Sequence, residues 1–232
     1  MNNRLIFSIF HSPFSTKYMN FGFLIFDDAE ELDWVGPWEV ITAWGLMPDG
    51  PQHCFTVSER GGAVRCAKGL RVLADYSFAD CPPLDYLLIP GGQGTRREAQ
   101  NDVLLEFVRE QAAHCRQVIS VCTGSFVLHA AGLLKGKTAT TYWGSLNRLR
   151  EAGVRVEEKR WVRTGNVWTA AGVSAGIDAA LALVAAEAGA EVAGEVQFYI
   201  EYYPENIRYG DAHTRPDAPA YLRMSEDRKP RA

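Results

Sequence analysis

The chain has 232 residues, of which 47% are hydrophobic and 22% charged, and its formal net charge is −4. This composition is typical of a globular domain and excludes a low-complexity or fibrous chain. The negative charge and the lack of a basic block lead us to expect no nucleic-acid partner. No apolar run approaches the roughly 20 residues of a membrane span, so no membrane partner is expected either.

Strands and helices are predicted to alternate along the chain. We expect a disordered extension over 1–18, one domain over 19–205 and an irregular C-terminal tail over 206–232. Within the domain, short apolar β-branched runs predict strands and periodic apolar positions predict helices. The predicted strands are 21–26, 54–58, 86–89, 118–121 and 137–142, with a hairpin over 161–170 and hairpin or edge structure over 60–80. The predicted helices are 32–44, 101–115, 145–152, 175–188 and 191–202, with one more directly after Cys122.

This order of elements predicts an α/β fold. Strands such as 21–26 are apolar throughout, as expected when both faces of a sheet are buried. Alternation with helices then predicts a mostly parallel sheet that is covered by helices on both faces. Ligands of such sheets bind beyond the carboxyl ends of the strands, where three loops of this chain converge.

The most informative of these loops carries Cys122, at a sharp turn between a strand and a helix. Backbone N–H groups and the helix dipole at such a turn favour a thiolate, which is the nucleophilic form of cysteine. The alternative is that Cys122 is a small core residue. Thr123 follows it, either to position a water or substrate or to begin the helix. No histidine has an obvious relation to Cys122, so no Cys–His dyad is assigned.

The other two loops offer an acid and a pair of glycines. Asp33 lies within an acidic run whose other members we expect to be solvated. It is either the N-cap of a helix or a partly buried acid with a raised pKa that faces Cys122. Gly91 and Gly92 form either a plain turn or one wall of an oxyanion site with backbone N–H donors. Tyr142 lines either the pocket or the core.

The five cysteines are odd in number and irregularly spaced, and no CxxC occurs. A disulfide framework or a zinc site is therefore not expected, and the cytoplasm is the natural compartment.

Four segments together resemble the ThiJ/PfpI superfamily in order and spacing: LIFDDAEELDWVGPWEV, LDYLLIPGG, SVCTGSFVLHAAGLLKGKTATTYW and AAGVSAGIDAAL. The resemblance covers about residues 20–205. It implies a class I glutamine amidotransferase-like fold, that is, a flavodoxin-like three-layer sandwich with a nucleophile-elbow cysteine. Within the superfamily, the chain is most similar to isonitrile hydratases, which implies catalytic roles for Asp33, Cys122 and Thr123. Val35 and Tyr142 replace a threonine and a histidine that are common there, and this leaves specificity open.

The resemblance implies that water is added to an isonitrile to give an N-substituted formamide, through a covalent thioimidate on Cys122. It implies Asp33 as acid and base, a small-molecule substrate, no metal or organic cofactor, and a homodimer. Two alternatives stay open. One is a glyoxalase- or deglycase-like enzyme that acts on reactive carbonyls, although many of these carry a histidine where Thr123 stands. The other is a cysteine-based redox or stress-response protein.

Overall fold

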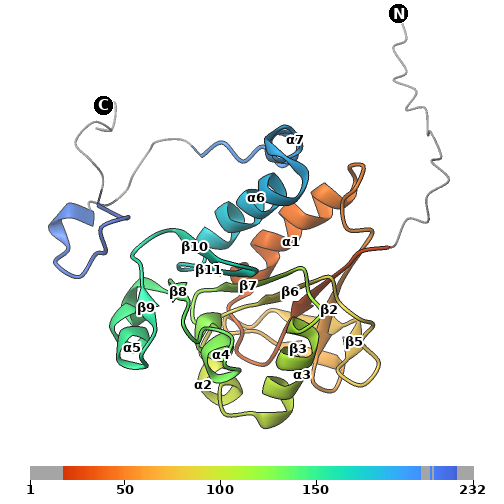
Figure 1. Ribbon diagram of the computed structural model, residues 1–232, viewed down its shortest axis with the longest axis horizontal. Coiled ribbons are helices and arrows are strands. Elements are labelled where there is room, and N and C mark those ends of the chain that lie inside the picture. Colours follow the sequence, from red (N-terminus) through yellow and green to blue (C-terminus); the bar gives the residue numbers. More distant parts are fainter. Residues whose placement is uncertain (1–17, 205–209, 211, 224–232) are drawn as a thin grey trace, which may run out of the picture.

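The computed structural model describes residues 18–204, 210 and 212–223 (Figure 1). The predicted extension therefore lies outside the described residues except for Tyr18, and the predicted tail is described only in part. A seven-stranded sheet forms the centre, in the order β10-β11-β7-β6-β1-β2-β5. Its strands are β1 (Asn20–Leu24), β2 (His53–Ser58), β5 (Tyr76–Ser77), β6 (Tyr86–Ile89), β7 (Gln117–Val121), β10 (Trp161–Thr164) and β11 (Val167–Ala170). Every neighbouring pair is parallel except β10 with β11.

Helices cover both faces of this sheet. In Figure 1, α1 (Glu31–Gly45), α6 (Ala175–Ala188) and α7 (Ala190–Tyr199) lie on one side of it. On the other side lie α2 (Thr95–Glu98), α3 (Asp102–Ala112) and α4 (Gly124–Ala130). The predicted α/β, flavodoxin-like sandwich is thus confirmed. Among the described residues, no helix is long and apolar enough to cross a membrane.

The alternation of side chains along β1 explains why the sheet needs both helical layers. Phe21 and Phe23 belong to the core cluster beneath α1 and α6, whereas Leu24 belongs to the cluster beneath α3 and α4. Successive residues of a strand point to opposite faces, so a strand that is apolar throughout is stable only between two apolar layers. Each of these large side chains is fully buried and contributes about 1.5–3 kcal/mol to the stability of the fold.

Smaller elements surround the sheet. A hairpin of β3 (Gly62–Arg65) and β4 (Arg71–Ala74) projects beside the start of α1, and β8 (Thr138–Ala139) pairs with β9 (Arg155–Val156). The remaining elements are η1 (Trp143–Ser145), α5 (Leu146–Glu151) and η2 (Ala212–Thr214).

The sequence prediction was wrong for the strand 137–142, of which only β8 forms. Beyond Ala139, side chains replace the ladder of backbone hydrogen bonds. The Thr140 N–H donates to Thr169 Oγ1 at 2.8 Å, and Thr141 Oγ1 donates to the carbonyl oxygen of Cys122 at 2.8 Å. These bonds turn the chain toward the site. The sequence pattern does not reveal α2 and β9, because these elements are too short to show a period.

The N-cap of α3 gives a first testable prediction. Asn101 accepts hydrogen bonds from the N–H groups of Val103 and Leu104. Its amide also donates to Glu59 and Glu98. We expect Asn101→Ala to lower the free energy of unfolding by about 1–2 kcal/mol in urea denaturation. The neighbouring exposed Gln100→Ala is the control, and equal effects of the two substitutions would contradict a capping role.

Candidate active site

The loops after β1, β6 and β7 meet at one edge of the sheet, because these parallel strands end together there. An isolated bridge joins Ala29 to Gly92, and the Glu30 N–H donates to the Gly91 carbonyl oxygen at 2.9 Å. The N-cap of α1 is Glu30, so the N-cap interpretation of Asp33 is wrong. Asp33 instead lies in the first helical turn, buried and directed at the loop after β6.

Cys122 lies between β7 and α4 in a left-handed conformation, with φ 56°. Its N–H donates to the carbonyl oxygens of Ala170 (3.1 Å) and Ala171 (2.9 Å), which anchor the turn. Val173, two residues further on, also has positive φ, 42°, which is a strained conformation for a β-branched residue. Strain of this kind is found where the surroundings over-determine a functional geometry.

Asp33 and Cys122 face one another across Gly91. Asp33 is fully buried (0% exposed) and its Oδ2 accepts the Gly91 N–H at 2.8 Å. Its Oδ1 is buried without a hydrogen-bond partner among the described residues. A β-carbon placed on Gly91 would lie 2.7 Å from Cys122 Cβ and 2.8 Å from Asp33 Oδ2. Only a residue without a side chain therefore fits between the acid and the thiol.

The protonation of this pair is set by burial. Desolvation raises the Asp33 pKa from 3.8 to about 7, while the hydrogen bond from Gly91 and the contact with Cys122 oppose the increase. The predicted increase for Asp33 therefore holds.

The expectation of a stabilised thiolate does not hold for Cys122. Burial, followed by the charge of Asp33, raises the pKa of its thiol above the ordinary value. Hydrogen bonds from the backbone of Thr123 and Val173 lower it, but less. Cys122 is only 7% exposed, and α4 is only 7 residues long. Desolvation therefore has a larger effect on the thiol pKa than the helix dipole.

Thr123 joins the loop of Cys122 to the loop of the two glycines. It is the N-cap residue of α4 but makes no side-chain capping bond. Its Oγ1 instead accepts from the Gly92 N–H at 3.0 Å and from Thr95 Oγ1 at 3.0 Å, and it also hydrogen-bonds to Cys122. The N–H groups of Gly91 and Gly92 are thus both engaged by side chains in this structure. The N–H groups that face the Cys122 sulfur are those of Thr123 and Val173.

Val173 is the site residue that the sequence did not reveal. A β-branched residue gives no signal for positive φ, so only the structure identifies its N–H as a neighbour of the sulfur. Tyr142 is partly buried, and a β-carbon on Gly172 would lie 2.7 Å from its ring, so the ring lies against the loop that carries Val173.

The other members of the acidic run remain exposed or partly exposed, as expected, and most of them also have a structural role. Asp27 Oδ1 accepts the Arg65 N–H at 2.8 Å, and Glu31 Oε1 accepts the Lys68 N–H at 2.6 Å. Glu30 forms an ion pair with the Lys68 side chain. These bonds hold the β3–β4 hairpin against the start of α1, which keeps Asp33 covered.

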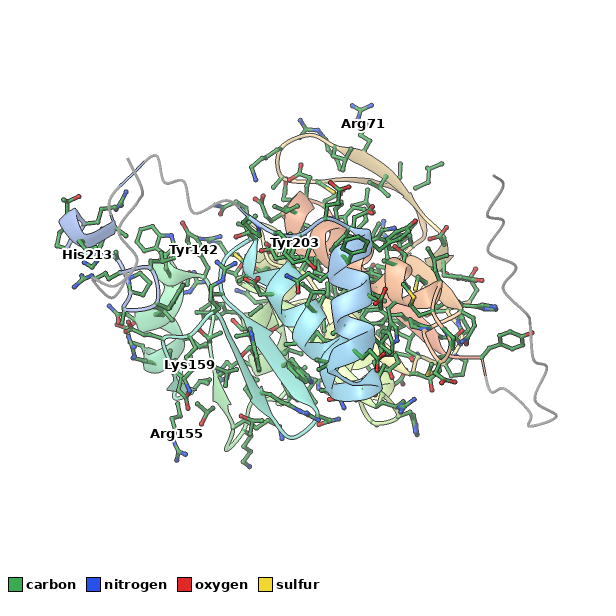
Figure 2. All side chains as sticks on the ribbon, turned by 90° about the horizontal axis from the view of Figure 1, so that it is seen from above. Arg71, Tyr142, Arg155, Lys159, Tyr203 and His213 are labelled. Carbon is green, nitrogen blue, oxygen red and sulfur yellow. The ribbon has the colours of Figure 1, made fainter. Side chains whose placement is uncertain are left out.

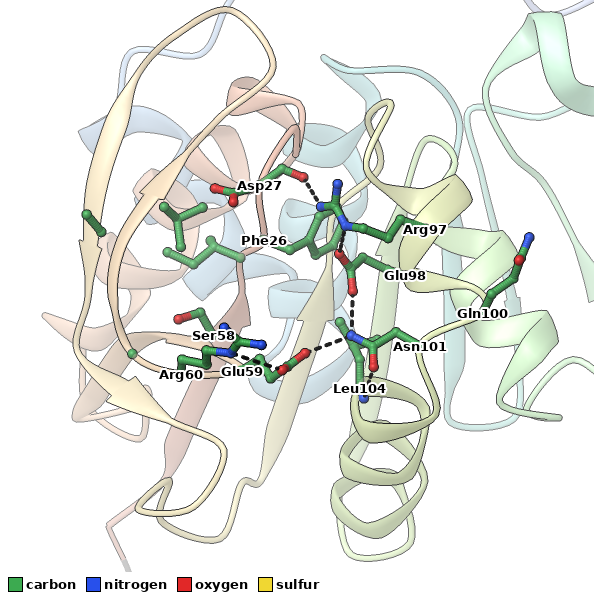
Figure 3. Close-up of a pocket in the computed structure, with 14 residues that line it drawn as sticks. Phe26, Asp27, Ser58, Glu59, Arg60, Arg97, Glu98, Gln100, Asn101 and Leu104 are labelled. Atoms are coloured by element: carbon green, nitrogen blue, oxygen red, sulfur yellow. Dashed lines mark hydrogen bonds and ion pairs between the residues drawn. The ribbon is translucent and has the colours of Figure 1, made fainter.

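A separate cavity of about 740 Å³ lies on the α3 side of β1 and is drawn in Figure 3. Its lining does not include Cys122, Asp33 or Thr123. The polar groups that line it pair with one another: Arg97 with Glu98, and Asn101 with both Glu98 and Glu59. In the described part of the chain, no group of three or more His, Cys, Asp or Glu side chains is arranged to hold a metal ion.

Comparison with known proteins places this geometry in a family. The profile of the DJ-1/PfpI family matches residues 20–186. The chain belongs to the DJ-1/PfpI family. A crystal structure of a ThiJ/PfpI family protein from Pseudomonas syringae superposes with a TM-score of 0.78 at 30% identity, covering 93% of this chain and 89% of that one. The resemblance inferred from the sequence motifs is thereby confirmed.

Two named DJ-1/PfpI relatives are informative about function. An isonitrile hydratase of Pseudomonas putida is 41% identical over 156 residues, which cover 67% of this chain and 66% of that protein, just under two thirds of its length. The deglycase PfpI of Pyrococcus furiosus is 27% identical over 150 residues, covering 64% of this chain and 88% of the relative.

Proposed function

We propose that this protein hydrates isonitriles to N-substituted formamides through a covalent intermediate on Cys122. The observation that carries the proposal is the buried Asp33–Cys122 pair, in which the carboxyl has a pKa of about 7. The similarity to an isonitrile hydratase supports the same reaction. The terminal carbon of an isonitrile accepts both a proton and a nucleophile, so one carboxyl and one thiol are sufficient to add S–H across it.

In the first step, the Asp33 carboxylate takes the proton of the Cys122 thiol as the sulfur forms a bond to the terminal carbon. Asp33 then gives this proton to the same carbon. The isonitrile becomes a thioimidate, R–N=CH–S–Cys122, and the protein neither gains nor loses a net proton. The N–H groups of Thr123 and Val173 stabilise the negative charge that develops on the sulfur.

In the second step, water adds to the thioimidate. Asp33 takes a proton from the water, whose oxygen bonds to the carbon, and the proton passes to the nitrogen. The Thr123 hydroxyl orients this water. The C–S bond of the tetrahedral intermediate then breaks, the thiolate recovers a proton from the new hydroxyl group, and the formamide leaves. No metal or organic cofactor takes part. We infer a homodimer, as the family resemblance implies, and a cytoplasmic location, as the cysteine pattern indicates.

The test is to incubate the purified protein with cyclohexyl isocyanide and to measure the formamide. We expect wild type to form it and Cys122→Ala to form none. Cys115→Ala is the matched control, because Cys115 is buried to the same extent (7% exposed) but lies in the opposite core cluster. Equal, negligible rates for wild type and Cys122→Ala would refute the assignment.

A second candidate function uses the same thiol on a reactive carbonyl such as methylglyoxal. The similarity to a deglycase supports it, at lower identity. Formation of lactate by wild type but not by Cys122→Ala, together with no turnover of cyclohexyl isocyanide, would establish it in place of the first.

A further inference from the structure

The C-terminal segment 212–223 folds back onto the body of the protein beside the site. The Arg215 guanidinium lies 5.5 Å from the centre of the Trp143 ring in η1. The Ala220 N–H donates to Glu158 Oε2 at 3.3 Å, and Ala218 is buried against the body. Figure 2 shows the turn that carries His213 on the same side of the molecule as Tyr142.

Two arginines give this segment a defined shape. Arg215 forms a two-pronged ion pair with Asp217, at 3.1 and 2.9 Å. Arg223 Nη2 donates to the carbonyl oxygens of Arg215 (3.3 Å) and Pro216 (2.9 Å), which joins the end of the segment to its beginning. The segment is therefore a closed turn that holds the residues between these arginines in place.

Tyr221 is the aromatic side chain that this turn places against the core of the body. Its partly buried ring packs against the core cluster that contains Cys122. Burial raises the pKa of Tyr221 to about 12, Arg160 opposes the increase, and the charges of Glu158, Cys122 and Tyr142 add to it. The phenol thus shares the electrostatic environment of the thiol.

Tyr142 lies directly before η1, and its ring packs on the loop that leads to the strained residue Val173. A β-carbon on Gly172 would approach the Tyr142 ring to 2.7 Å, so this ring rests directly on the backbone of that loop. Like Tyr221, the ring packs against the cluster that contains Cys122. One aromatic ring from the body and one from the C-terminal turn therefore pack against the core cluster that contains the thiol, and the ring from the body lies on the loop whose Val173 N–H faces the sulfur.

The charged groups near Tyr221 already have partners. Arg160 Nε donates to Asp178 at 2.7 Å, and Glu158 accepts from Arg150 at 2.6 Å. A charged substituent on a substrate would find no free counter-ion among them, whereas an apolar one would gain contact with two rings.

We propose that Tyr221, held over the site by the C-terminal turn, forms with Tyr142 an aromatic wall that limits the size of the substituent on the substrate and favours an uncharged hydrocarbon group. The identity of the substrate as an isonitrile rests on the proposed function. The size limit that the two rings impose acts on any reagent that approaches Cys122, so it can be tested without an isonitrile.

The first measurement does not depend on turnover. Alkylation of Cys122 by N-ethylmaleimide and by the bulkier N-cyclohexylmaleimide is followed by mass spectrometry of the peptide that contains Cys122. We expect Tyr221→Ala to raise the rate ratio of cyclohexyl to ethyl reagent about tenfold, the lower end of the range over which pockets discriminate hydrocarbon size. Tyr221→Phe keeps the ring, and Leu222→Ala alters an exposed neighbour, so both should keep the wild-type ratio. Arg215→Ala, which releases the turn from Trp143, should change the ratio in the same direction as Tyr221→Ala.

The second measurement is kcat/KM for cyclohexyl and 1-adamantyl isocyanide, with circular dichroism to verify folding. We expect Tyr221→Ala to raise the ratio of adamantyl to cyclohexyl about tenfold. If hydration occurs and neither ratio changes, the proposed function stands and the wall is refuted. If no isonitrile is hydrated but the maleimide ratio changes, the wall stands and the proposed function fails.

Discussion

Asp33→Asn is expected to give a protein that is more stable than wild type at pH 8 and nearly inactive. The Asp33 pKa is about 7 in the folded protein and ordinarily 3.8. Below pH 4 the carboxyl is protonated whether the chain is folded or not, so folding buries no charge. As pH rises through 7 the folded protein must bury a carboxylate, and the stability present at low pH is lost. The difference between the two pKa values corresponds to roughly 4 kcal/mol at alkaline pH.

Asparagine removes this cost but introduces a smaller one. Its carbonyl can still accept the Gly91 N–H, whereas its NH₂ takes the position of the unpartnered Oδ1 and costs about 1–3 kcal/mol. We therefore expect a net gain of about 2 kcal/mol at pH 8, falling to near zero at pH 5, in urea denaturation. The control is Asp49→Asn, an exposed residue at φ 65°, which asparagine adopts readily. A gain that does not depend on pH would contradict the buried-carboxylate explanation.

The same substitution tests the role of Asp33 in catalysis. The reactive pair carries one proton, so kcat/KM of wild type should rise with pH through about 7, as Asp33 becomes able to accept the thiol proton. It should fall again only when the thiol itself ionises, above the ordinary value of 9.0. We expect Asp33→Asn to lower kcat/KM about 10²–10⁴-fold and to abolish the acidic limb. Retention of that limb in the variant would assign it to another group.

Gly91→Ala is expected to remove nearly all activity. The added methyl group would lie 2.5 Å from the Thr123 nitrogen, in addition to its contacts with Cys122 and Asp33. Backbone and short side chains cannot rotate away, so the two loops must separate. Because a displacement of about 1 Å costs roughly 10²-fold in rate, and here both the thiol and the acid move, we expect a loss of at least about 10³-fold in kcat/KM. Overpacking should also destabilise the fold by about 1–3 kcal/mol.

The matched control is Gly194→Ala in α7. A β-carbon there meets nothing within 4 Å, so the substitution should stabilise the helix by up to about 1 kcal/mol and leave turnover unchanged. If Gly91→Ala kept kcat/KM within about tenfold of wild type, the close approach of the acid and the thiol across Gly91 would be contradicted.

The geometry around Cys122 does not favour the alternative of a redox-responsive protein. Peroxide reacts with the thiolate, and both burial and Asp33 raise the pKa of the Cys122 thiol. The resting protein therefore holds this cysteine mainly as a protonated, shielded thiol. In the proposed mechanism the raised thiol pKa is no obstacle, because Asp33 removes the proton at the moment of attack.

The sequence by itself determined the architecture and the order of the site loops. Buried strands such as β1 and β6 are apolar throughout, and Cys122 follows such a strand directly, so both features are local and visible in one dimension. The pattern of loops also singled out Asp33 and Thr123 with two interpretations each, and the family resemblance added the catalytic one. The predicted end of the strand at β8 was wrong, because Thr140 and Thr141 do not continue the backbone hydrogen bonds of a sheet. They form bonds that involve a side chain and a residue distant in the sequence.

Only the tertiary structure decided how protons are shared and what lies in front of the thiol. The pKa values of Asp33 and Cys122 depend on desolvation by residues from several elements, a quantity that no local pattern encodes. The N–H of Val173 faces the sulfur because the strained loop after β11, the strand that pairs with β7, crosses there. Tyr221 packs against the core cluster that contains Cys122 because long-range contacts fold a segment without a periodic pattern back onto the body. Local propensity therefore specifies strands, helices and turns, whereas burial and contacts across long sequence separations specify the chemistry.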